Sequence, residues 1–379
     1  MARVRRLRVA PRPGWKEKVE ALGFDFHTHL QVSPPQPYWD ETACYAFDMG
    51  EIERLEAATA ELHRMALEAA GYVVAKERYA QLGIPPHWWG LIEASWRRED
   101  FSLYGRFDLL YVPKQPPRLL EYNADTPTTL LEAAVVQWFW KEEVFPKADQ
   151  WNRLHEALIE RWGTLSPRTL HFTYAGGSLE DQRTAEYLAD TAAQAGHHVH
   201  LLPIEAIGWD GLRFLDEELR PIQTIFKLYP WEWWLQEEFG VHLLEETFRP
   251  IEPAWKLLLS NKGLLAILWE LFPGHPNLLP AYFKPERLAG PMVQKPLFSR
   301  EGANVSVWEG GAVRLATPGP YGEEGFVYQA YCPPPVFDGY HPVLGAWVVG
   351  GAPAGMGLRE DQGPITQNAS RFAPHIIEV

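Results

Sequence analysis

One stretch of the sequence, residues 106–123, restricts the possible fold more than any other. The segments Arg106–Val112 and Arg118–Asn123 are rich in apolar residues and read as β-strands, and three prolines lie between them. Prolines end strands and favour turns, so the sequence predicts an antiparallel hairpin with its turn centred at residues 114–115.

This hairpin brings charged side chains face to face. Side chains alternate along a strand, so Arg106 and Asp108 share one face. Glu121 and Asn123 share a face for the same reason. The turn position predicts that Asp108 lies opposite Glu121, which places Arg106 opposite Asn123.

Two opposed carboxylates repel each other unless a cation lies between them. Mg²⁺ takes carboxylate and amide oxygens as ligands, together with phosphate oxygens and water. The residues therefore favour a magnesium site formed by Asp108, Glu121 and Asn123. The alternative, equally open on the hairpin alone, is that Arg106 neutralises the two acids on a solvent-facing sheet.

A second signal lies in the segment Lys295–Asn304, where a lysine at a strand end precedes a loop of small residues. Such loops bring backbone N–H groups close to phosphate oxygens, although this one is not a Walker A motif. Lys256 and Lys262, upstream of it, add positive charge. Phosphoryl transfer depends on Mg²⁺, lysine and arginine, and a glycine-rich flap can exclude water.

The rest of the chain predicts a mixture of helices and strands. Residues 51–82 show the apolar spacing of a long amphipathic helix, and a second helix is expected over 129–144. A β-α-β unit is expected in mid-chain, and short strands with glycine-rich links in the last third. The expected ranges are 169–174, 180–195 and 198–204 for that unit, 262–272 for a further helix, and 292–295, 305–308, 327–331, 343–349 and 354–359 for the late strands.

Composition excludes several classes of function. The formal net charge is −14, which argues against nucleic acid as the main partner. The longest apolar run, Leu130–Trp140, is too short and too polar to cross a membrane. The only cysteines, Cys44 and Cys332, are far apart, as expected in a reducing cytoplasm. Arginines at the N-terminus, with no apolar stretch after them, predict a solvated basic arm rather than a secretion signal.

Long motifs occupy four segments: Glu121–Thr128, Trp255–Lys262, Lys295–Gly302 and Ala354–Asp361. Together they resemble the synthetase domain of the glutathionylspermidine synthase family, and most closely its stand-alone acid–amine ligases. The resemblance runs from about Pro13 to the C-terminus. It implies an α+β fold of the permuted ATP-grasp form, with a pre-ATP-grasp N-terminal and central region and a mobile β-rich lid.

The resemblance also implies an arrangement along the chain. We expect a basic arm over residues 1–23, a helical region with the metal-binding hairpin over 24–165, a substrate-side lobe over 166–250, and the lysines, lid and adenine-binding region over 251–379. Since the sequence has no room for the amidase domain of the bifunctional family members, we expect the amide-cleaving half to be missing.

The resemblance also implies roles for individual residues of the site. The Mg²⁺ ligands would be Asp108, Glu121 and Asn123, with Arg106 and Arg359 as catalytic cations. ATP would be bound by Lys256, Lys295, Glu301 and Gly302, and its adenine by Gln329, Ala330, Tyr331 and Cys332. Substrates would contact Thr126, Thr129, Glu180 and Asp181, although the threonines could equally cap a helix, and Ser178 to Asp181 also has the pattern of a helix cap.

The implied activity is that of a carbon–nitrogen ligase with small-molecule substrates. A carboxylate would attack the γ-phosphate of ATP, and an amine would then displace phosphate from the acyl phosphate. The acid is expected to be peptide-like or glutathione-like, and the amine polyamine-like.

Three other interpretations are open. A peptide or amino-acid ligase differs only in the amine, and an inactive nucleotide-binding scaffold would retain the same fold. His27-Thr-His29 resembles the metal-binding pair of amidohydrolase barrels, which makes a metal-dependent hydrolase the third.

Overall fold

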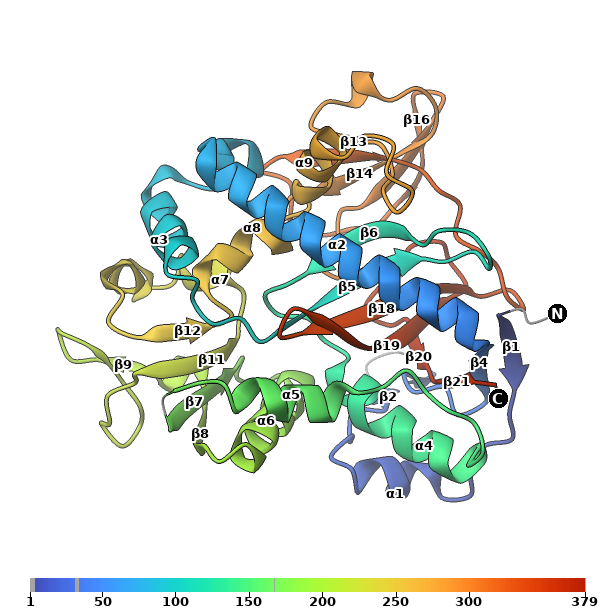
Figure 1. Cartoon of the computed structure of the whole chain (residues 1–379), viewed down its shortest axis with the longest axis horizontal. Helices are drawn as coiled ribbons and strands as arrows, with labels where there is room; N and C mark the ends of the chain where they lie inside the picture. Colours follow the sequence, from blue (N-terminus) through green and yellow to red (C-terminus); the bar gives the residue numbers. More distant parts are fainter. Residues whose placement is uncertain (1–3, 31–33, 167, 379) are drawn as a thin grey trace.

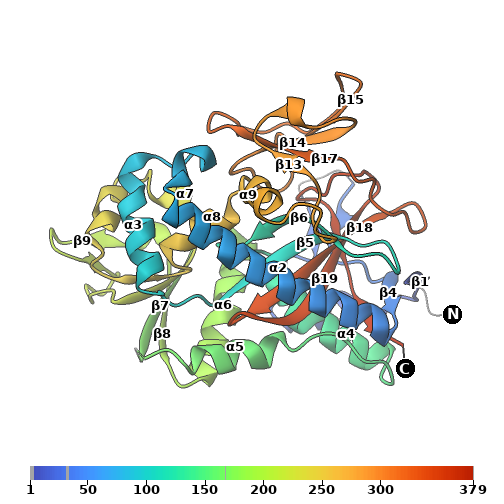
Figure 2. The ribbon, with the colours of Figure 1, turned by 45° about the horizontal axis from the view of Figure 1, so that its top comes forward.

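The computed structural model describes residues 4–30, 34–166 and 168–378 and has the mixed α and β character expected from the sequence. Helices pack around several separate sheets (Figures 1 and 2). The α-helices are α1 (Trp15–Glu20), α2 (Met49–Ala75), α3 (Pro86–Arg97), α4 (Gln137–Val144), α5 (Leu154–Trp162), α6 (Leu179–Gln194), α7 (Trp231–Trp234), α8 (Leu257–Ser260) and α9 (Leu264–Leu271).

A five-stranded antiparallel sheet lies behind α2 and carries the hairpin. Its register confirms the prediction, with Asp108 opposite Glu121 and Arg106 opposite Asn123. The predicted hairpin around Gly350-Gly351 is also present and supplies the neighbouring strands. In spatial order the strands are β20 (Arg371–Ala373), β19 (Ala352–Asp361), β18 (His341–Val349), β5 (Tyr104–Leu110) and β6 (Arg118–Asn123).

A second antiparallel sheet, at the top of Figure 1, holds the other late strands that the sequence predicts. The additional strands β13 and β16 were not predicted, because β13 has only two residues and every residue of β16 is exposed. The order is β13 (Ala281–Tyr282), β17 (Phe326–Ala330), β14 (Met292–Pro296), β15 (Ser306–Glu309) and β16 (Ala312–Ala316).

A parallel sheet contains the predicted β-α-β unit, in which α6 connects its two strands. Two further strands escaped prediction, one of which carries Lys227 with its side chain wholly buried. There Lys227 Nζ lies 2.5 Å from Asp125 Oδ1, so this ion pair joins the parallel sheet to the segment that follows the hairpin. The order is β12 (Arg249–Ile251), β11 (Thr224–Leu228), β7 (Thr169–Tyr174) and β8 (His198–Pro203).

The expectation of a solvated basic arm at the N-terminus holds for Arg5 and Arg8, which are exposed, but is wrong for Arg6 and Arg12, and Arg3 lies outside the described residues. Arg6 lies in a strand, and its side chain is 7% exposed and paired with Glu360 at 2.7 Å. Arg12 is equally buried and pairs with Glu41 at 2.6 Å. Arginine-rich sequence alone does not reveal such distant partners. The strands here are β1 (Arg5–Arg8), β4 (Ala43–Phe47) and β21 (His375–Ile377), with short pairs β2 (Thr28–His29) with β3 (Gln36–Pro37), and β9 (Gly208–Trp209) with β10 (Phe214–Leu215).

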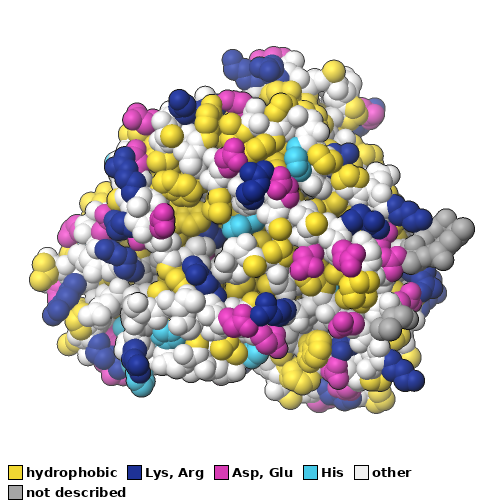
Figure 3. All heavy atoms as spheres, viewed as in Figure 1, with side chains coloured by type: hydrophobic (Ala, Val, Ile, Leu, Met, Phe, Trp, Pro, Cys, Tyr) yellow, Lys and Arg dark blue, Asp and Glu magenta, His cyan; other side chains and the backbone are white. Residues whose placement is uncertain are grey.

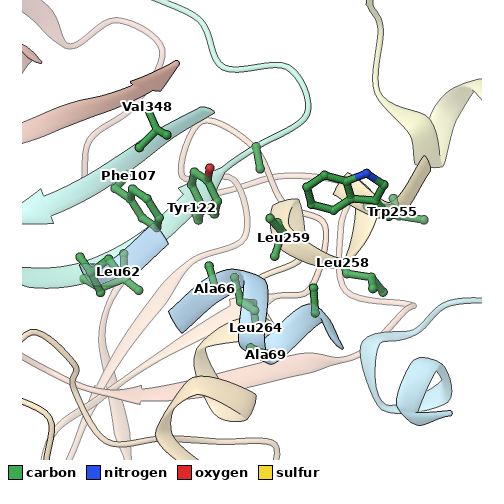
Figure 4. Packing of buried hydrophobic residues seen from close by; sticks show 14 of the residues in the cluster. Leu62, Ala66, Ala69, Phe107, Tyr122, Trp255, Leu258, Leu259, Leu264 and Val348 are labelled. Carbon is green, nitrogen blue, oxygen red and sulfur yellow. The ribbon is translucent and has the colours of Figure 1, made fainter. Parts of the chain in front are cut away.

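The long helix α2 organises the larger core. Asp48 caps its start by accepting from the backbone N–H of Glu51 at 2.8 Å. Its buried face packs against both the central sheet and the segment α8–α9, as Figure 4 shows for Leu62, Phe107 and Leu258. The apolar positions predicted from spacing, listed in order, are all buried: Ile52, Leu55, Leu62, Met65, Ala69 and Val73.

Two predicted helices differ from the observed ones near their ends. The first stops at Ala75, and Glu77 with φ 51° separates it from a 3-10 turn, Arg78–Leu82. The helix expected over 129–144 contains a π-helical turn at Glu132–Val136, which places one extra residue in the turn. A prediction from the spacing of apolar residues assumes regular helix geometry, so it misses both the early end of the first helix and the π-helical turn in the second. Within the described ranges, none of the helices combines the length and apolarity needed to cross a bilayer.

The C-terminal strand is fastened by the buried side chain of His375. Its Nδ1 lies 2.9 Å from Gln137 Oε1, and its Nε2 accepts from the backbone N–H of Trp151 at 3.2 Å. This pattern requires the neutral imidazole, and burial lowers the pKa of His375 to about 3.

We predict that His375 makes the fold sensitive to mild acid. Because the pKa of His375 is lower in the folded than in the unfolded chain, its contribution to the free energy of unfolding is complete above pH 6.5. Below that pH the contribution falls by up to about 1.4 kcal/mol per pH unit. Urea unfolding should show that His375→Asn has a lower free energy of unfolding than wild type at pH 7. At pH 5 this difference in the free energy of unfolding should be smaller by about 2 kcal/mol. His87→Asn, at an exposed site on α3, is the control. A gap that stays constant with pH would contradict this role.

Candidate active site

The opposed carboxylates of Asp108 and Glu121 form the centre of the candidate site. Asn123 Nδ2 lies 3.2 Å from Asp108 Oδ2 and 3.0 Å from Glu121 Oε1, so the three side chains converge as predicted. Turned about its amide, Asn123 presents an oxygen instead of the nitrogen. The donor set then consists of two carboxylates and an amide oxygen, which fits Mg²⁺.

Cationic side chains flank the two acids on opposite sides. Arg106 binds Asp108 through two contacts, 2.7 Å from Nε to Oδ1 and 3.1 Å from Nη2 to Oδ2. Lys262 lies between α8 and α9 and places Nζ 2.9 Å from Glu121 Oε2. Both arrangements are largely buried, so these charges are weakly screened by solvent.

Lys295 lies at the end of β14 and completes the cationic surroundings. Its Nζ donates to the carbonyl of Leu120 at 2.9 Å and to Gln329 Oε1 at 2.8 Å. Burial lowers the pKa of Lys295 to about 8, although the carboxylate of Glu121 opposes the shift. An arriving phosphate would favour the charged form of this lysine.

The two carboxylates differ in their ease of ionisation. Burial opposes the ionisation of Glu121, but Lys262 and Lys295 outweigh it and lower its pKa to about 2. Burial raises the pKa of Asp108 above its ordinary value, despite Arg106. Glu121 is therefore the more readily ionised member of the pair.

A mainly apolar pocket opens beside the carboxylates. It has the apolar character of a small-molecule site with polar groups at one end. Of the residues proposed from sequence, eight lie on its wall: Asp108, Glu121, Lys295, Gly302, Gln329, Ala330, Tyr331 and Cys332. Its apolar wall includes Leu110, Leu120, Leu279, Val293, Val305, Val307 and Val343.

Two loops meet over this pocket. In the first, Glu301 and Gly302 have φ of 53° and 69°, so the chain turns sharply after Lys295. The second loop includes Thr366, and a Cβ on Gly302 would come within 2.5 Å of its carbonyl oxygen. Glycine at 302 thus permits the close approach of the loops.

Arg300 attaches the first loop to the parallel-sheet side of the molecule. Its guanidinium lies 2.8 Å from Glu232 Oε1 and donates to Thr126 Oγ1 at 2.7 Å. Thr126, expected to contact substrate, therefore binds an arginine of the loop in this structure.

Arg359 supports the second loop. Its Nη2 donates to the backbone carbonyls of Gln367 at 2.5 Å, Asn368 at 2.9 Å and Ser370 at 3.3 Å. The structure therefore places Arg359 at the base of the loop and outside the wall of the pocket.

Lys256 is not brought to the pocket. It is buried beneath the hairpin, donates to the carbonyls of Tyr104 at 2.8 Å and Ala124 at 3.2 Å, and lies 3.3 Å from Glu252 Oε2. Lys262, six positions later in the same motif, is the lysine that contacts Glu121.

Thr129 contacts Arg106 from the far side of the carboxylates. Its Oγ1 accepts from Arg106 Nη1 at 3.3 Å, and the carbonyl of Thr128 accepts from the same nitrogen at 2.5 Å. Thr129 has φ 69°, which is a strained conformation for a β-branched residue and is typical of functional sites.

Glu180 and Asp181 lie together at the start of α6. The capping pattern is confirmed, since the Ser178 hydroxyl accepts from the backbone N–H of Asp181 at 3.3 Å. Burial, with the nearby Glu132 carboxylate, raises the pKa of Glu180 to about 8. Burial likewise raises the pKa of Asp181 to about 6. A cation bound here would offset this unfavourable concentration of acids.

The sequence analysis missed Glu132 and Tyr38. Glu132 is fully buried in the π-helical turn, and the hydroxyl of Tyr38 donates to its Oε1 at 2.5 Å. A carboxylate inside an otherwise apolar helical segment was the available signal for Glu132.

The histidines of the His27-Thr-His29 pattern point to different neighbours. His27 Nε2 lies 3.0 Å from Glu20 Oε1, whereas the ring of His29 lies 5.2 Å from that of Tyr38. Across the described parts of the chain, no three histidine, cysteine or acidic side chains are grouped to hold a metal ion.

Comparison with known proteins gives a family match over almost the whole chain. The model of the family described as glutathionylspermidine synthase preATP-grasp matches residues 6–378. A Haemophilus influenzae protein named "Putative acid--amine ligase" is 43% identical over 382 residues, which cover 96% of this chain and 97% of that protein.

More distant relatives are larger proteins. Trypanothione synthetase of Crithidia fasciculata is 28% identical, and the match covers 84% of this chain and 54% of the relative. The bifunctional glutathionylspermidine synthetase/amidase of Escherichia coli is also 28% identical, with 88% and 59% covered. The chain thus spans little more than half the length of these two relatives.

One solved structure supports the fold. A glutathione synthetase-like effector from Globodera pallida superposes with a TM-score of 0.62 at 8% identity, covering 97% of this chain and 96% of that one. The expected fold is confirmed in this coarser form, as a mixed α and β fold of the glutathione synthetase-like, ATP-grasp type.

We predict that Lys262 and Lys256 have different roles. Lys262→Met should weaken ATP binding at least tenfold, because it removes a charge beside Glu121 and the first loop. It should cost less stability than Lys256→Met, because Glu121 is 25% exposed whereas Glu252 is fully buried. Lys256→Met should lower the free energy of unfolding by about 3–5 kcal/mol, because it leaves Glu252 buried without its cation. Nucleotide titration and urea unfolding of both variants measure these effects. A stable Lys256→Met protein with lost ATP binding would reverse the assignment.

Proposed function

The chain belongs to the glutathionylspermidine synthase preATP-grasp family and is a carbon–nitrogen ligase, and we propose that it joins a carboxylic acid to an amine at the expense of ATP. The single observation that carries this proposal is the convergence of the Asp108–Glu121 pair, three buried cations and an apolar pocket. These are the parts that phosphoryl transfer to a carboxylate requires.

In this proposal the pocket holds ATP, with the adenine ring between the apolar walls. The segment Gln329–Cys332 would lie along the adenine ring, and Lys295 would neutralise phosphate oxygens at the polar end of the pocket. Asp108, Glu121 and Asn123 would hold Mg²⁺, which neutralises charge on the phosphates when bound. The metal ligands precede Lys295 in the sequence, as in the permuted form of the fold.

The substrate carboxylate attacks the γ-phosphorus, giving an acyl phosphate and ADP. An amine nitrogen then attacks the acyl carbon, the C–O bond to phosphate breaks, and the amide and phosphate are released. Arg106 is held rigidly by Asp108 and the carbonyl of Thr128, so its guanidinium can stabilise the oxyanion without reorganising.

The two loops act as the lid over the intermediate. An acyl phosphate is hydrolysed by water, so the site needs cover during the reaction. Gly302 and Thr366 already meet across the pocket, and Arg359 and Arg300 hold their respective loops. Arg359 thus supports catalysis by positioning the lid.

The amine enters on the side of Glu180 and Asp181. Burial and neighbouring carboxylates raise their pKa values although Arg359 and Arg300 oppose the shifts, and the positive charge of a polyamine-like substrate would favour their ionised forms. Thr126 and Thr129, beside Arg300 and Arg106, line the approach of the acid.

ADP release in the presence of Mg²⁺ tests the proposed function. Glutathione, short peptides and amino acids are each paired with spermidine and with simpler amines, and products are identified by mass. We expect ADP release only when an acid and an amine are both present. Product mass distinguishes a polyamine ligase from a peptide ligase.

Within that assay, Glu121→Gln should reduce turnover at least 100-fold, because the metal site loses one of its two carboxylate ligands. Glu309→Gln, at an exposed ion pair on the second sheet, is the matched control. Near-normal activity of Glu121→Gln would remove the metal-site assignment.

We predict that Glu180 and Asp181 set the affinity for a cationic amine. The double variant Glu180→Gln, Asp181→Asn should raise the KM for a polyamine at least tenfold and leave the KM for ATP unchanged. Because the pKa of Glu180 is about 8, wild type should bind the amine more weakly at pH 6 than at pH 8, and the variant should lose this difference. An unchanged amine KM would limit both acids to capping α6.

A further inference from the structure

A second recess opens on the opposite face of the central sheet from the ATP pocket. Side chains alternate on β6, so Tyr122 points away from the face that carries Glu121. The Tyr122 hydroxyl lies 3.2 Å from His63 Nδ1 of α2, and His63 lines the recess. Figure 3, which faces α2, shows hydrophobic, basic and histidine atoms around a hollow near the middle of this side.

The recess is open to solvent. It is formed by α2, the end of α3 with the loop after it, α5, the 3-10 turn Ala254–Lys256 before α8, and the turn between β18 and β19. The lining residues that matter here are His63, Trp96, Glu99, Asp100, Arg161 and Trp255.

The charge of Arg161 is not compensated in this recess. Its Nε donates to the carbonyl of Ser102 at 3.0 Å, and its guanidinium lies over the ring of Phe101 at 4.2 Å. Neither partner is charged, and in the described part of the chain Arg161 forms no ion pair with a carboxylate. Burial consequently lowers the pKa of Arg161, with only a distant contribution from Glu252 in the other direction.

The acids nearby are either paired or exposed. Asp100 Oδ2 lies 2.7 Å from Arg98, which also contacts Glu246, and Glu252 lies 3.3 Å from Lys256. Glu99 is exposed at the rim. Among the lining residues, Arg161 is thus a cation without a carboxylate partner, and its guanidinium is available to an anion.

The walls beside Arg161 are aromatic. Trp96 and Trp255 meet edge to face with ring centroids 5.4 Å apart and an interplanar angle of 78°. The turn between β18 and β19 lies close to Arg161, since a Cβ on Gly350 would lie 3.0 Å from Arg161 Cδ. Gly350 also has φ 57°, which favours glycine at this position. These walls select a flat apolar body in preference to an extended polar one.

We propose that this recess binds a small aromatic carboxylate, with its carboxylate on Arg161 and its ring against Trp96 and Trp255. Arginine suits a carboxylate because its planar donors match the two oxygens. The site is separate from the ATP pocket and does not depend on the proposed ligase reaction.

The test uses 2-naphthoate as probe and isothermal titration in saturating Mg-ADP, so that the nucleotide pocket is filled. We expect saturable binding of 2-naphthoate and at least tenfold weaker binding of 2-naphthylmethanol and of acetate. Arg161→Gln should weaken 2-naphthoate binding at least tenfold, while Arg161→Lys should recover part of it. Arg153→Gln, at an exposed arginine at the opposite end of α5, is the control and should bind as wild type does.

ADP affinity measured on each variant reports whether the protein is folded. The proposal is overturned if wild type shows no saturable binding of 2-naphthoate. It is also overturned if Arg161→Gln binds 2-naphthoate as wild type does, or if 2-naphthylmethanol and 2-naphthoate bind equally well.

Discussion

The repulsion between Asp108 and Glu121 is the constraint around which the rest of the molecule is arranged. Two partly buried carboxylates placed opposite each other raise the free energy of the fold unless positive charge surrounds them. The chain meets this requirement with Arg106 from the same strand, Lys262 from the link between α8 and α9, and Lys295 from a different sheet. Each element that contributes a cation is thereby oriented toward the same point, and the apolar pocket forms where they meet.

The features of the hairpin could be predicted because local physics determines them. Alternation and the proline turn are enough to derive the pairing of Asp108 with Glu121, and the apolar period is enough to find α2. The residues of the pocket wall were reached through the resemblance to a known family, since Gln329–Cys332 carries no chemical signal of its own. Local pattern and family motif together described the centre of the site well.

The remaining errors involve side chains whose partners are distant in sequence. Lys256 and Lys262 lie six positions apart in one motif, and only the packing of α8 shows which of them reaches Glu121. Arg6 looks solvated in sequence, yet its partner Glu360 comes from the other end of the chain. Strand β11 was not predicted because it contains a lysine, Lys227, and buried strands are usually apolar. The partner that permits its burial, Asp125, is distant in the sequence, so the ion pair cannot be inferred from the strand alone.

The strand order has a consequence for synthesis on the ribosome. Strand β18, which pairs with β5 along six residues, is made more than two hundred residues after it. Until then the hairpin has an unpaired edge, and its acids lack Lys262 and Lys295 until those two residues have in turn been made. During vectorial synthesis the hairpin therefore presents an open, charged β-edge until β18 has emerged, and the central sheet is completed only after that strand is available.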